Sequence, residues 1–600
     1  MDMSSSPAGL EFLPDELLLE ICRYLHCSHV LYSFFNLNSR LNQTITSYCR
    51  HVWFRRASYR QLLHIYDSIL PQIGPAIISL TIHPLHQSSF PLSFKFQLPN
   101  ICPFLKHLTL TSWRSEYLLS YMMDSLRQMN CLEKLTIQEL SCSDKIDDTK
   151  FLIEFFQIKN SCLNEIIFDH DCDSFNLEKS SPMTFIVADH LRSLTIQLHT
   201  LKDFSKLIHY IPQIVQLDVT IKESSLKPVP ILTNLPLLKQ FSLWCVHWYS
   251  HLSDLPPLIR LAPSMEQFAL TISTHDVDLI NGEKLLDIFP LQLKQFHYSV
   301  CYYALDFAEQ FNLDQMTKSW QTMPIIYSIS QEDHRIFLHT LPYASSRLII
   351  RSSLAKNIPV KDSSQIYSNI TQIQVYSMKN LPDIFPILAQ CRRVRELTLL
   401  TVQDSGKSNF LTPTTSSAKP IELPSLSRLD ILTIEGIPSD LHHLKELLLA
   451  AVNLTVLVID LDCLLALLEN EDQSLIVYVL LHRRILDLCI RVEGNKTDPE
   501  QIKQSKITIE QIHLIARVFT KVRNLTIDYE SSEQIIQTDL IQSVIHVFEN
   551  LVIFHVYGHI PAHLSADHAR TWLSTQNFSR MKSTDIFRVE CSEKWFKLWL

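Results

Sequence analysis

A short apolar pattern recurs along most of this chain and restricts the folds that it can adopt. Each copy has an apolar residue, two variable residues, a second apolar residue, one variable residue and a third apolar residue. The copies read FLKHLTL, CLEKLTI, CLNEIIF, HLRSLTI, QIVQLDV, LLKQFSL, SMEQFAL and QLKQFHY, and later RVRELTL, RLDILTI, NLTVLVI, RILDLCI, KVRNLTI and NLVIFHV. From Leu105 to Leu293 their first apolar residues are 23 to 31 positions apart. Regular spacing in this range is typical of stacked structural repeats.

The pattern predicts one short strand and one helix or loop per repeat. The last two apolar residues of each copy alternate with a polar one, the period of a half-buried strand. Following stretches such as LHHLKELLLAAV have a helical period. Chance clustering is the alternative in a chain that is 46% hydrophobic, but fourteen copies at similar spacing favour repeats. The spacing fails between Phe296 and Val394, with one weak copy at NITQIQV, and residues 403–424 are predicted to be a surface loop.

Glycine is scarce, which excludes several classes of enzyme. The chain has 7 glycines among 600 residues, where average usage would give about 42. The nearest two, Gly406 and Gly436, are 30 positions apart. Phosphate-binding loops and nucleophile elbows need glycines a few positions apart, because the backbone must turn sharply or approach a ligand closely. The sequence therefore contains no dinucleotide-binding fingerprint, P-loop or hydrolase elbow.

Charge and cysteine content narrow the possible partners and the compartment. The formal charge of −9 is spread without long runs of either sign, so we expect no binding to nucleic acid. No apolar run reaches the ~18 to 20 residues of a membrane-spanning helix, and the start has no secretory signal, so no membrane is expected. The 14 cysteines include no C-x-x-C pair and fit reduced, buried thiols. The predicted location is cytoplasmic, nuclear or both.

The N-terminal stretch EFLPDELLLEICRYLHCSHVLYSFFNLNSRLNQTI predicts two or three short helices. Pro14 suits a first helical turn, and the acidic residues after it complement the positive end of a helix. Leu17, Ile21, Tyr24 and Leu25 then recur on one helical face. So small a helical unit buries too little surface to be stable alone, so its apolar face should be covered by another element or molecule.

This stretch resembles an F-box, in which Leu-Pro and an acidic residue begin an apolar helix that ends near Tyr-Leu. The matching residues here are Leu13, Pro14, Glu16, Leu17, Ile21, Tyr24, Leu25, Leu31, Phe34, Leu37 and Arg40. The resemblance implies docking onto the Skp adaptor and, through it, onto a cullin scaffold. It also implies the adaptor contacts Leu13, Pro14, Leu17, Leu18, Ile21 and Leu25. A plain helical cap on the first repeat is the alternative interpretation.

The repeats in turn resemble leucine-rich repeats, in a degenerate form. The family's Asn or Cys after each strand is missing, since Trp113, Leu140 and Asp171 stand at the corresponding positions. The predicted fold is α/β: a short N-terminal helical F-box followed by a degenerate leucine-rich-repeat-like solenoid of strand-plus-helix units. The predicted parts are an F-box domain (9–55), a first repeat block (75–300), an interruption or irregular segment (301–370) and a second repeat block (371–600).

Together the two resemblances imply the substrate-recognition subunit of a cullin-RING (SCF-type) ubiquitin ligase. Such a subunit holds an unknown target protein near a ubiquitin-charged enzyme and makes no bond itself, so no catalytic residue and no cofactor are expected. The alternative is a repeat scaffold for protein-protein interaction, with a helical cap and no ubiquitin role. A third possibility, an enzyme without a recognised motif, would need a deep pocket with converging acid and base groups.

Several residue groups are candidates for binding. The residues between the strand apolars are predicted to face the concave surface: Thr109, Thr136, Thr195, Asp218, Ser242, His297, Thr398, Thr526 and His555. Trp244, Trp248 and Tyr249 are candidate target-binding anchors, because aromatic residues are enriched at hot spots, although many such residues belong to a core. Three metal-like groups are interpreted as surface or structural residues: Asp169, Asp171 and Asp173; His247 with His251 and His559 with His563; and Cys22, His26, Cys27 and His29.

Overall fold

The computed structural model describes most of the chain and divides it into two compact units. The described residues are 13–54, 57–82, 98–141, 148–158, 162–177, 187–223, 234–248, 251–290, 293–303, 313–320, 323–330, 334–343, 346–351, 367, 369–378, 380–401, 423, 425–436, 441–469, 481–492, 507–529, 535–561, 566–576, 587–592 and 594–600. The first unit comprises residues 1–57, 61–324 and 332–338, and the second comprises 58–60, 325–331 and 339–600.

The first sheet is parallel and follows chain order from β1 to β10, and these ten strands lie in the first unit. The sheet has the order β1-β2-β3-β4-β5-β6-β7-β8-β9-β10-β12-β11. The strands are β1 (His51–Trp53), β2 (Ser79–Ile82), β3 (His107–Thr111), β4 (Lys134–Gln138), β5 (Glu165–Phe168), β6 (Ser193–Leu198), β7 (Gln216–Ile221), β8 (Gln240–Trp248), β9 (Gln267–Thr274), β10 (Gln295–Tyr303), β11 (Ile325–Ser330) and β12 (Arg335–Thr340). From β1 to β10 every pair of neighbours is parallel.

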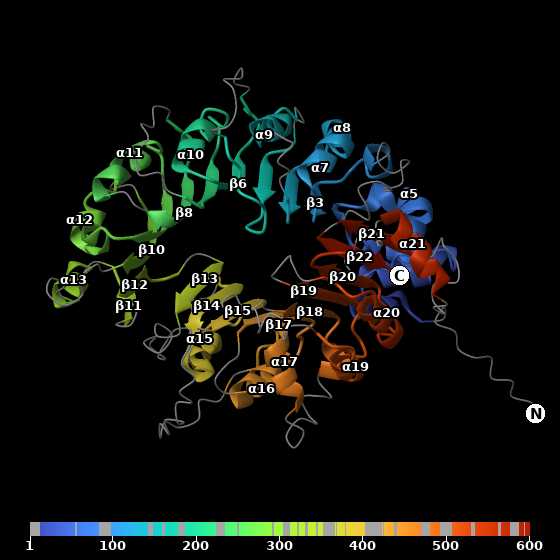
Figure 1. Cartoon of the computed structure of the whole chain (residues 1–600). Coiled ribbons are helices and arrows are strands. Elements are labelled where there is room, and N and C mark those ends of the chain that lie inside the picture. Colours follow the sequence, from blue (N-terminus) through green and yellow to red (C-terminus); the bar gives the residue numbers. More distant parts are fainter. Residues whose placement is uncertain are drawn as a thin grey trace, which may run out of the picture. The chain divides into compact units, whose positions relative to one another are not determined.

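The helices of the first unit connect these strands and cover one face of the sheet (Figure 1). Three helices precede the sheet: α1 (Asp15–Arg23), α2 (Cys27–Phe34) and α3 (Ser39–Tyr48). The others are α4 (Tyr59–His64), α5 (Leu70–Ile73), α7 (Ser115–Tyr121), α8 (Met123–Gln128), α9 (Asp148–Phe156), α10 (Leu201–Leu207), α11 (Leu255–Arg260), α12 (Gly282–Leu286) and α13 (Leu313–Ser319). Most are two turns or shorter, so packing rather than intrinsic propensity must stabilise them.

The second unit repeats this design and ends in an antiparallel hairpin. Its sheet has the order β13-β14-β15-β16-β17-β18-β19-β20-β22-β21. The strands are β13 (Arg347–Arg351), β14 (Gln372–Met378), β15 (Glu396–Thr401), β16 (Ile431–Glu435), β17 (Val456–Asp460), β18 (Asp487–Val492), β19 (Asn524–Tyr529), β20 (Ile553–Tyr557), β21 (Arg588–Ser592) and β22 (Trp595–Trp599). The helices are α15 (Phe385–Gln390), α16 (Leu441–Ala450), α17 (Leu461–Glu469), α19 (Ile509–Val518), α20 (Thr538–Val547) and α21 (Ala566–Thr575).

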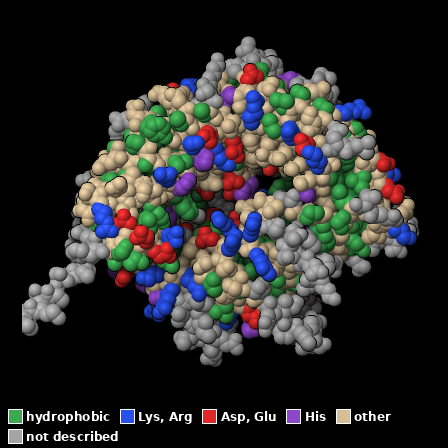
Figure 2. Space-filling view, turned by 180° about the vertical axis from the view of Figure 1, so that it is seen from behind, with side chains coloured by type: hydrophobic (Ala, Val, Ile, Leu, Met, Phe, Trp, Pro, Cys, Tyr) green, Lys and Arg blue, Asp and Glu red, His purple; other side chains and the backbone are tan. Residues whose placement is uncertain are grey.

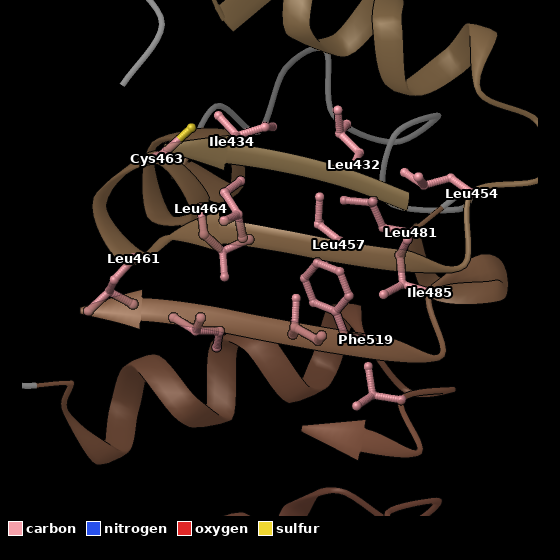
Figure 3. Close-up of a cluster of buried hydrophobic side chains, with 14 of the residues drawn as sticks. Leu432, Ile434, Leu454, Leu457, Leu461, Cys463, Leu464, Leu481, Ile485 and Phe519 are labelled. Carbon is pink, nitrogen blue, oxygen red and sulfur yellow. The ribbon is translucent and has the colours of Figure 1, made fainter. Parts of the chain in front are cut away.

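The core of each unit lies between its sheet and its helices. In the second sheet one register row consists of buried apolar residues from successive strands, among them Leu432, Leu457 and Leu488. Phe519, which follows α19, packs with this row and is fully buried (Figure 3). Full burial of one such side chain contributes about 2 to 3 kcal/mol, so the repeated row accounts for much of the stability of the unit.

The α/β class predicted from the sequence is confirmed, and the structure adds that most of the strands pair in parallel. In all fourteen copies of the apolar pattern the strand begins at the fourth of the seven quoted residues, as at His107 in FLKHLTL. The segment 301–370, predicted as an interruption, contains α13, β11, β12 and β13. The predicted loop 403–424 lies outside the described residues except for residue 423. Among the described helices none is both long enough and apolar enough to cross a membrane.

Candidate functional site

The first candidate surface is formed by the three N-terminal helices. Pro14 immediately precedes α1, and its carbonyl accepts hydrogen bonds from the backbone N–H groups of Leu17 and Leu18, each at 3.1 Å. Arg40 on α3 donates from Nη2 to the carbonyl of Leu13 at 2.5 Å. The Asn38 side chain caps α3 by accepting from the N–H of Leu41 at 2.8 Å. The Arg40 side chain thus holds the Leu13 carbonyl against the start of α3.

Only some of the apolar side chains of these three helices are buried between the helices. Leu18 and Cys22 of α1 are buried, and so are Leu41 and Ile45 of α3. These buried residues supply the contact between α1 and α3. On α1, Leu18 and Cys22 each follow by one position a residue of the apolar face that the helical period predicts, Leu17 and Ile21.

The apolar face that does begin at Leu17 is open to solvent. The side chain of Leu17 is 52% exposed, that of Tyr24 82% and that of Leu25 38%. Leu37, in the connection between α2 and α3, is 55% exposed. Exposed apolar side chains grouped on one small element are typical of a protein-binding surface. We refer to Leu17, Tyr24, Leu25 and Leu37 as the N-terminal apolar surface.

The residues predicted as adaptor contacts differ in their exposure to solvent. Pro14, Leu17 and Leu25 are exposed, Leu13 and Ile21 are partly exposed, and Leu18 is buried. Tyr24 and Leu37 were absent from that predicted set, although both are more exposed than Leu25. Both residues match the F-box pattern, and Tyr24 also lies on the predicted helical face, but the sequence alone does not identify which side of the helices is packed.

The second candidate surface is the sheet face opposite the helices in the first unit. One register row there carries Thr109, Thr136, Ile167 and Thr195 on β3 to β6, all partly exposed, and we refer to it as the threonine row. Asp218 and Ser242 continue this row. Burial raises the pKa of the Asp218 carboxyl, although a hydrogen bond with Ser242 opposes the shift.

The other predicted residues of these faces lie in equivalent registers. His297 pairs with Ala269 in the first sheet. In the second sheet Thr398 pairs with Gln374, and Thr526 with His555. Burial and, to a smaller extent, the positive charge of Lys597 lower the pKa of His555 to about 3. This ring is therefore neutral at physiological pH.

The three aromatic anchor candidates are only partly described. Trp244 lies in β8, opposite Thr220 and Thr271, and is partly exposed on the face that carries the threonine row. Trp248 ends β8, next to a register shift between Cys245 and Trp248. Tyr249 lies outside the described residues. Trp244 is therefore the anchor candidate that the structure places on a sheet face.

The acidic group after β5 forms a local hydrogen-bonded cluster. His170 Nδ1 lies 2.5 Å from Asp169 Oδ1, and Gln138 Nε2 donates to Asp169 Oδ2 at 3.2 Å. Burial alone would raise the pKa of Asp169, but the contacts with His170 and Gln138 lower it overall. Asp169, His170 and Asp171 each offer a ligand atom within 4.8 Å of the others. Asp169 already contacts both His170 and Gln138, as expected for a hydrogen-bonded surface group at a strand end.

The remaining His and Cys candidates do not assemble into a metal site within the described residues. His251 contacts Asp276, with 3.6 Å between Nδ1 and Oδ2. His563 lies outside the described residues. In the stretch that contains Cys22, His26, Cys27 and His29, the Cys27 thiol meets Cys49 instead.

A charged strip on the second sheet was not predicted from the sequence. Arg491 on β18 donates to Glu435 on β16, which is two strands away. It also pairs in register with Asp460 and Asp528 on the adjacent strands. Burial opposes a charged guanidinium, but Glu435 raises the pKa of Arg491 overall. The strip joins residues from four strands into one polar feature on this face.

Charges elsewhere on the surface are mixed. On the face shown in Figure 2, Lys and Arg side chains are interspersed with Asp and Glu. Across the first sheet Lys106 pairs with Glu133 at 2.7 Å and Lys134 with Glu165 at 2.8 Å. This alternation does not form a continuous basic surface on the view shown.

Comparisons with known proteins found neither a family model nor a curated protein that matches the chain.

Proposed function

We propose that this chain is a substrate-recognition subunit of a cullin-RING (SCF-type) ubiquitin ligase. In this proposal α1–α3 are an F-box that docks the Skp adaptor, and the two sheets with their helices are a degenerate leucine-rich-repeat-like solenoid that binds the target. The observation that carries the proposal is the N-terminal apolar surface, which lies beside the anchored Leu13–Pro14 pair.

The size and chemistry of this surface support docking of a folded partner. Leu17, Tyr24 and Leu25 belong to or directly follow one short helix, so a single groove on a partner can accept all three. Removing large apolar anchors from a small interface costs more than about 2 kcal/mol, which corresponds to roughly 30-fold weaker binding. Their exposure means that shortening them removes little of the interior packing of the chain.

The strand order supports the repeat part of the proposal. Fourteen copies of one sequence pattern each supply a strand, and from β1 to β10 each strand pairs with the one before it in the chain. Stacked repeats produce this order, because each repeat contacts only its neighbours. The threonine row and Trp244 then provide a polar face with an aromatic anchor for a protein target.

The decisive experiment measures binding of the purified full-length chain to purified Skp adaptor by isothermal titration calorimetry. The test variant combines Leu17→Ala, Tyr24→Ala and Leu25→Ala. The matched control combines Leu237→Ala and Val277→Ala, two apolar residues that are also exposed but lie elsewhere in the first unit. We expect the wild type and the control to bind equally and the test variant to bind at least about 30-fold more weakly.

The same measurement distinguishes the alternative function. A folded wild type that does not bind the adaptor contradicts the ligase proposal and leaves the scaffold with a helical cap. If the control variant loses as much binding as the test variant, the assignment of the docking surface is contradicted. Circular dichroism of each variant establishes that the helices remain folded in every comparison.

A further inference from the structure

Two cysteine thiols meet inside the N-terminal helices. Cys27 is the first residue of α2, and Cys49 directly follows α3, 22 positions later. The sulfur atoms of Cys27 and Cys49 lie 3.8 Å apart, within hydrogen-bonding distance of each other. A disulfide requires the two sulfur atoms at about 2.05 Å, so they must approach by less than about 2 Å. Side-chain rotation supplies movements of this size without unfolding of either helix.

The two thiols differ in accessibility. Cys27 is partly exposed, whereas Cys49 is 2% exposed. A small oxidant in solution therefore reaches Cys27 first. Cys22, the third cysteine of this region, is buried in α1 and is protected in the same way as Cys49.

The surroundings of Cys27 also favour its thiolate, the form that reacts with oxidants. The hydrogen bond with Cys49 lowers the pKa of Cys27, burial opposes the shift, and the backbone of Trp53 lowers it further. The sulfur lies at the positive end of an eight-residue helix, which stabilises negative charge. The same hydrogen bond, together with burial, raises the pKa of Cys49, so Cys49 stays protonated while Cys27 reacts.

We propose that Cys27 and Cys49 are a peroxide-responsive pair that closes a reversible disulfide between α2 and the end of α3. Hydrogen peroxide oxidises the Cys27 thiolate, which takes up one oxygen and becomes sulfenic acid, with release of water after protonation. The sulfur of Cys49 then attacks the Cys27 sulfur, the S–S bond forms, and the sulfenic oxygen leaves as a second water. The balance is two thiols and one peroxide giving one disulfide and two waters.

This inference is independent of the proposed ligase role, because it rests only on the two sulfur atoms and their surroundings. Closure would join two helices that otherwise meet through side-chain packing, and a thiol reductant would reopen the bond. Cys27 would act as the oxidised residue and Cys49 as the resolving residue.

Peptide mapping of the full-length chain tests the proposal directly. The folded protein is treated with equimolar hydrogen peroxide, blocked with N-ethylmaleimide and digested with trypsin without reduction. Cleavage after Arg23, Arg40 and Arg50 places Cys22, Cys27 and Cys49 in three separate peptides, so the linked pair is unambiguous. We expect peptide 24–40 to be joined to peptide 41–50, with the sum of the two masses reduced by about 2 Da, and dithiothreitol to release both.

Variants assign the roles of the two thiols. In Cys49→Ser the sulfenic acid should persist at Cys27 and be trapped by dimedone, whereas in Cys27→Ser residue Cys49 should remain a thiol. Cys591→Ser is the matched control, since Cys591 is a partly exposed thiol on β21 in the second unit. This control should form the Cys27–Cys49 link as the wild type does.

Three results would overturn the proposal. One is the absence of the 24–40 and 41–50 link in folded, oxidised wild type. The second is an equal yield of that link in protein unfolded with urea, because native proximity would then not cause it. The third requires no variant: alkylation of Cys49 before Cys27 in the folded wild type would contradict their assigned accessibility.

Discussion

Arg40 and Asp15 are joined by two hydrogen bonds although they are 25 positions apart in the chain. Arg40 donates to Asp15 Oδ1 from Nε at 2.9 Å and from Nη2 at 2.6 Å, and the same Nη2 holds the Leu13 carbonyl. Both charged side chains are nearly half exposed. This contact connects the first residue of α1 with α3 and orients the Leu13–Pro14 pair beside the N-terminal apolar surface.

Replacement of Arg40 by alanine should affect binding more than stability. Exposed ion pairs contribute about 0 to 1 kcal/mol, so urea unfolding should change by less than about 1 kcal/mol. If the proposed docking is right, adaptor affinity should fall, because Leu13 and Pro14 lose their anchor. Arg23→Ala, which removes an exposed ion pair with Glu20, is the control and should leave affinity unchanged. Equal affinities for all three proteins would contradict the anchoring role of Arg40.

Gly436→Ala should destabilise the second unit strongly. Gly436 has φ +80°, a conformation that disfavours side chains, and an added Cβ would overlap the Thr401 hydroxyl. Its N–H also donates to the buried Asp460 carboxylate. Strain and overlap together predict a loss of about 2 to 5 kcal/mol in the free energy of unfolding.

A second substitution separates the two causes at Gly436. The double variant Gly436→Ala, Thr401→Gly removes the overlap and keeps the backbone strain, so a double-mutant cycle in urea should show positive coupling of more than about 1 kcal/mol. Simple additivity of the two single changes would mean that Thr401 does not limit space at this turn.

His339 predicts a pH dependence with a definite sign. The ring lies 2% exposed in β12 with Nε2 3.1 Å from the Tyr367 hydroxyl, and burial lowers its pKa to about 4. The unfolded chain takes up a proton near pH 6.5, but the folded chain does not until about pH 4. The contribution of His339 to the free energy of unfolding is therefore complete above pH 6.5 and is lost as the pH falls to about 4. Below that value it no longer changes with pH.

His339→Gln removes this proton uptake and tests the sign. The difference in free energy of unfolding between wild type and variant should change by roughly 3 kcal/mol between pH 7 and pH 4, with the wild type losing more. His251→Gln, at a side chain that is 80% exposed, is the control. A difference between wild type and His339→Gln that is independent of pH would show that His339 is not buried in its neutral form.

Asp203 should be essential to the start of α10. It is fully buried, and its carboxylate accepts from the N–H of Leu177 at 2.6 Å and from the N–H and hydroxyl of Thr200 at 2.8 and 2.7 Å. Asp203→Ala leaves these donors without an acceptor, at a cost of about 2 to 4 kcal/mol in thermal or urea unfolding. Glu283→Ala, an exposed acidic residue in the first turn of α12, should change stability by less than about 0.5 kcal/mol. Equal effects at both positions would contradict this role.

The strands could be predicted from the sequence because a strand has a simple period. Alternation in FLKHLTL determines which residues are buried, and the structure begins the strand at His107, where the alternation starts. The hairpin of β21 and β22 was not predicted, although WFKLW alternates as well. It falls outside the repeat pattern, and antiparallel pairing with β20 replaces the parallel pairing of the other repeats.

The candidate surfaces were harder to predict, since they depend on packing between distant residues. On α1 the residues Leu17 and Leu18 are both apolar, and only their contacts decide that Leu18 is buried and Leu17 exposed. The strip around Arg491 combines Glu435, Asp460 and Asp528 from three other strands. No local motif contains these residues, so their association appears only once the strand register is known.

The order of the strands has a consequence for synthesis of the chain. From β1 to β10 each strand pairs with the strand made just before it, and β13 to β20 follow the same rule. A growing chain that leaves the ribosome can therefore add one strand at a time to a sheet that already exists, because no strand in these series must wait for a distant one. The hairpin of β22 and β21 breaks the rule at the end, where β22 pairs with β20. The last edge of the second sheet can thus close only after β22 has been synthesised.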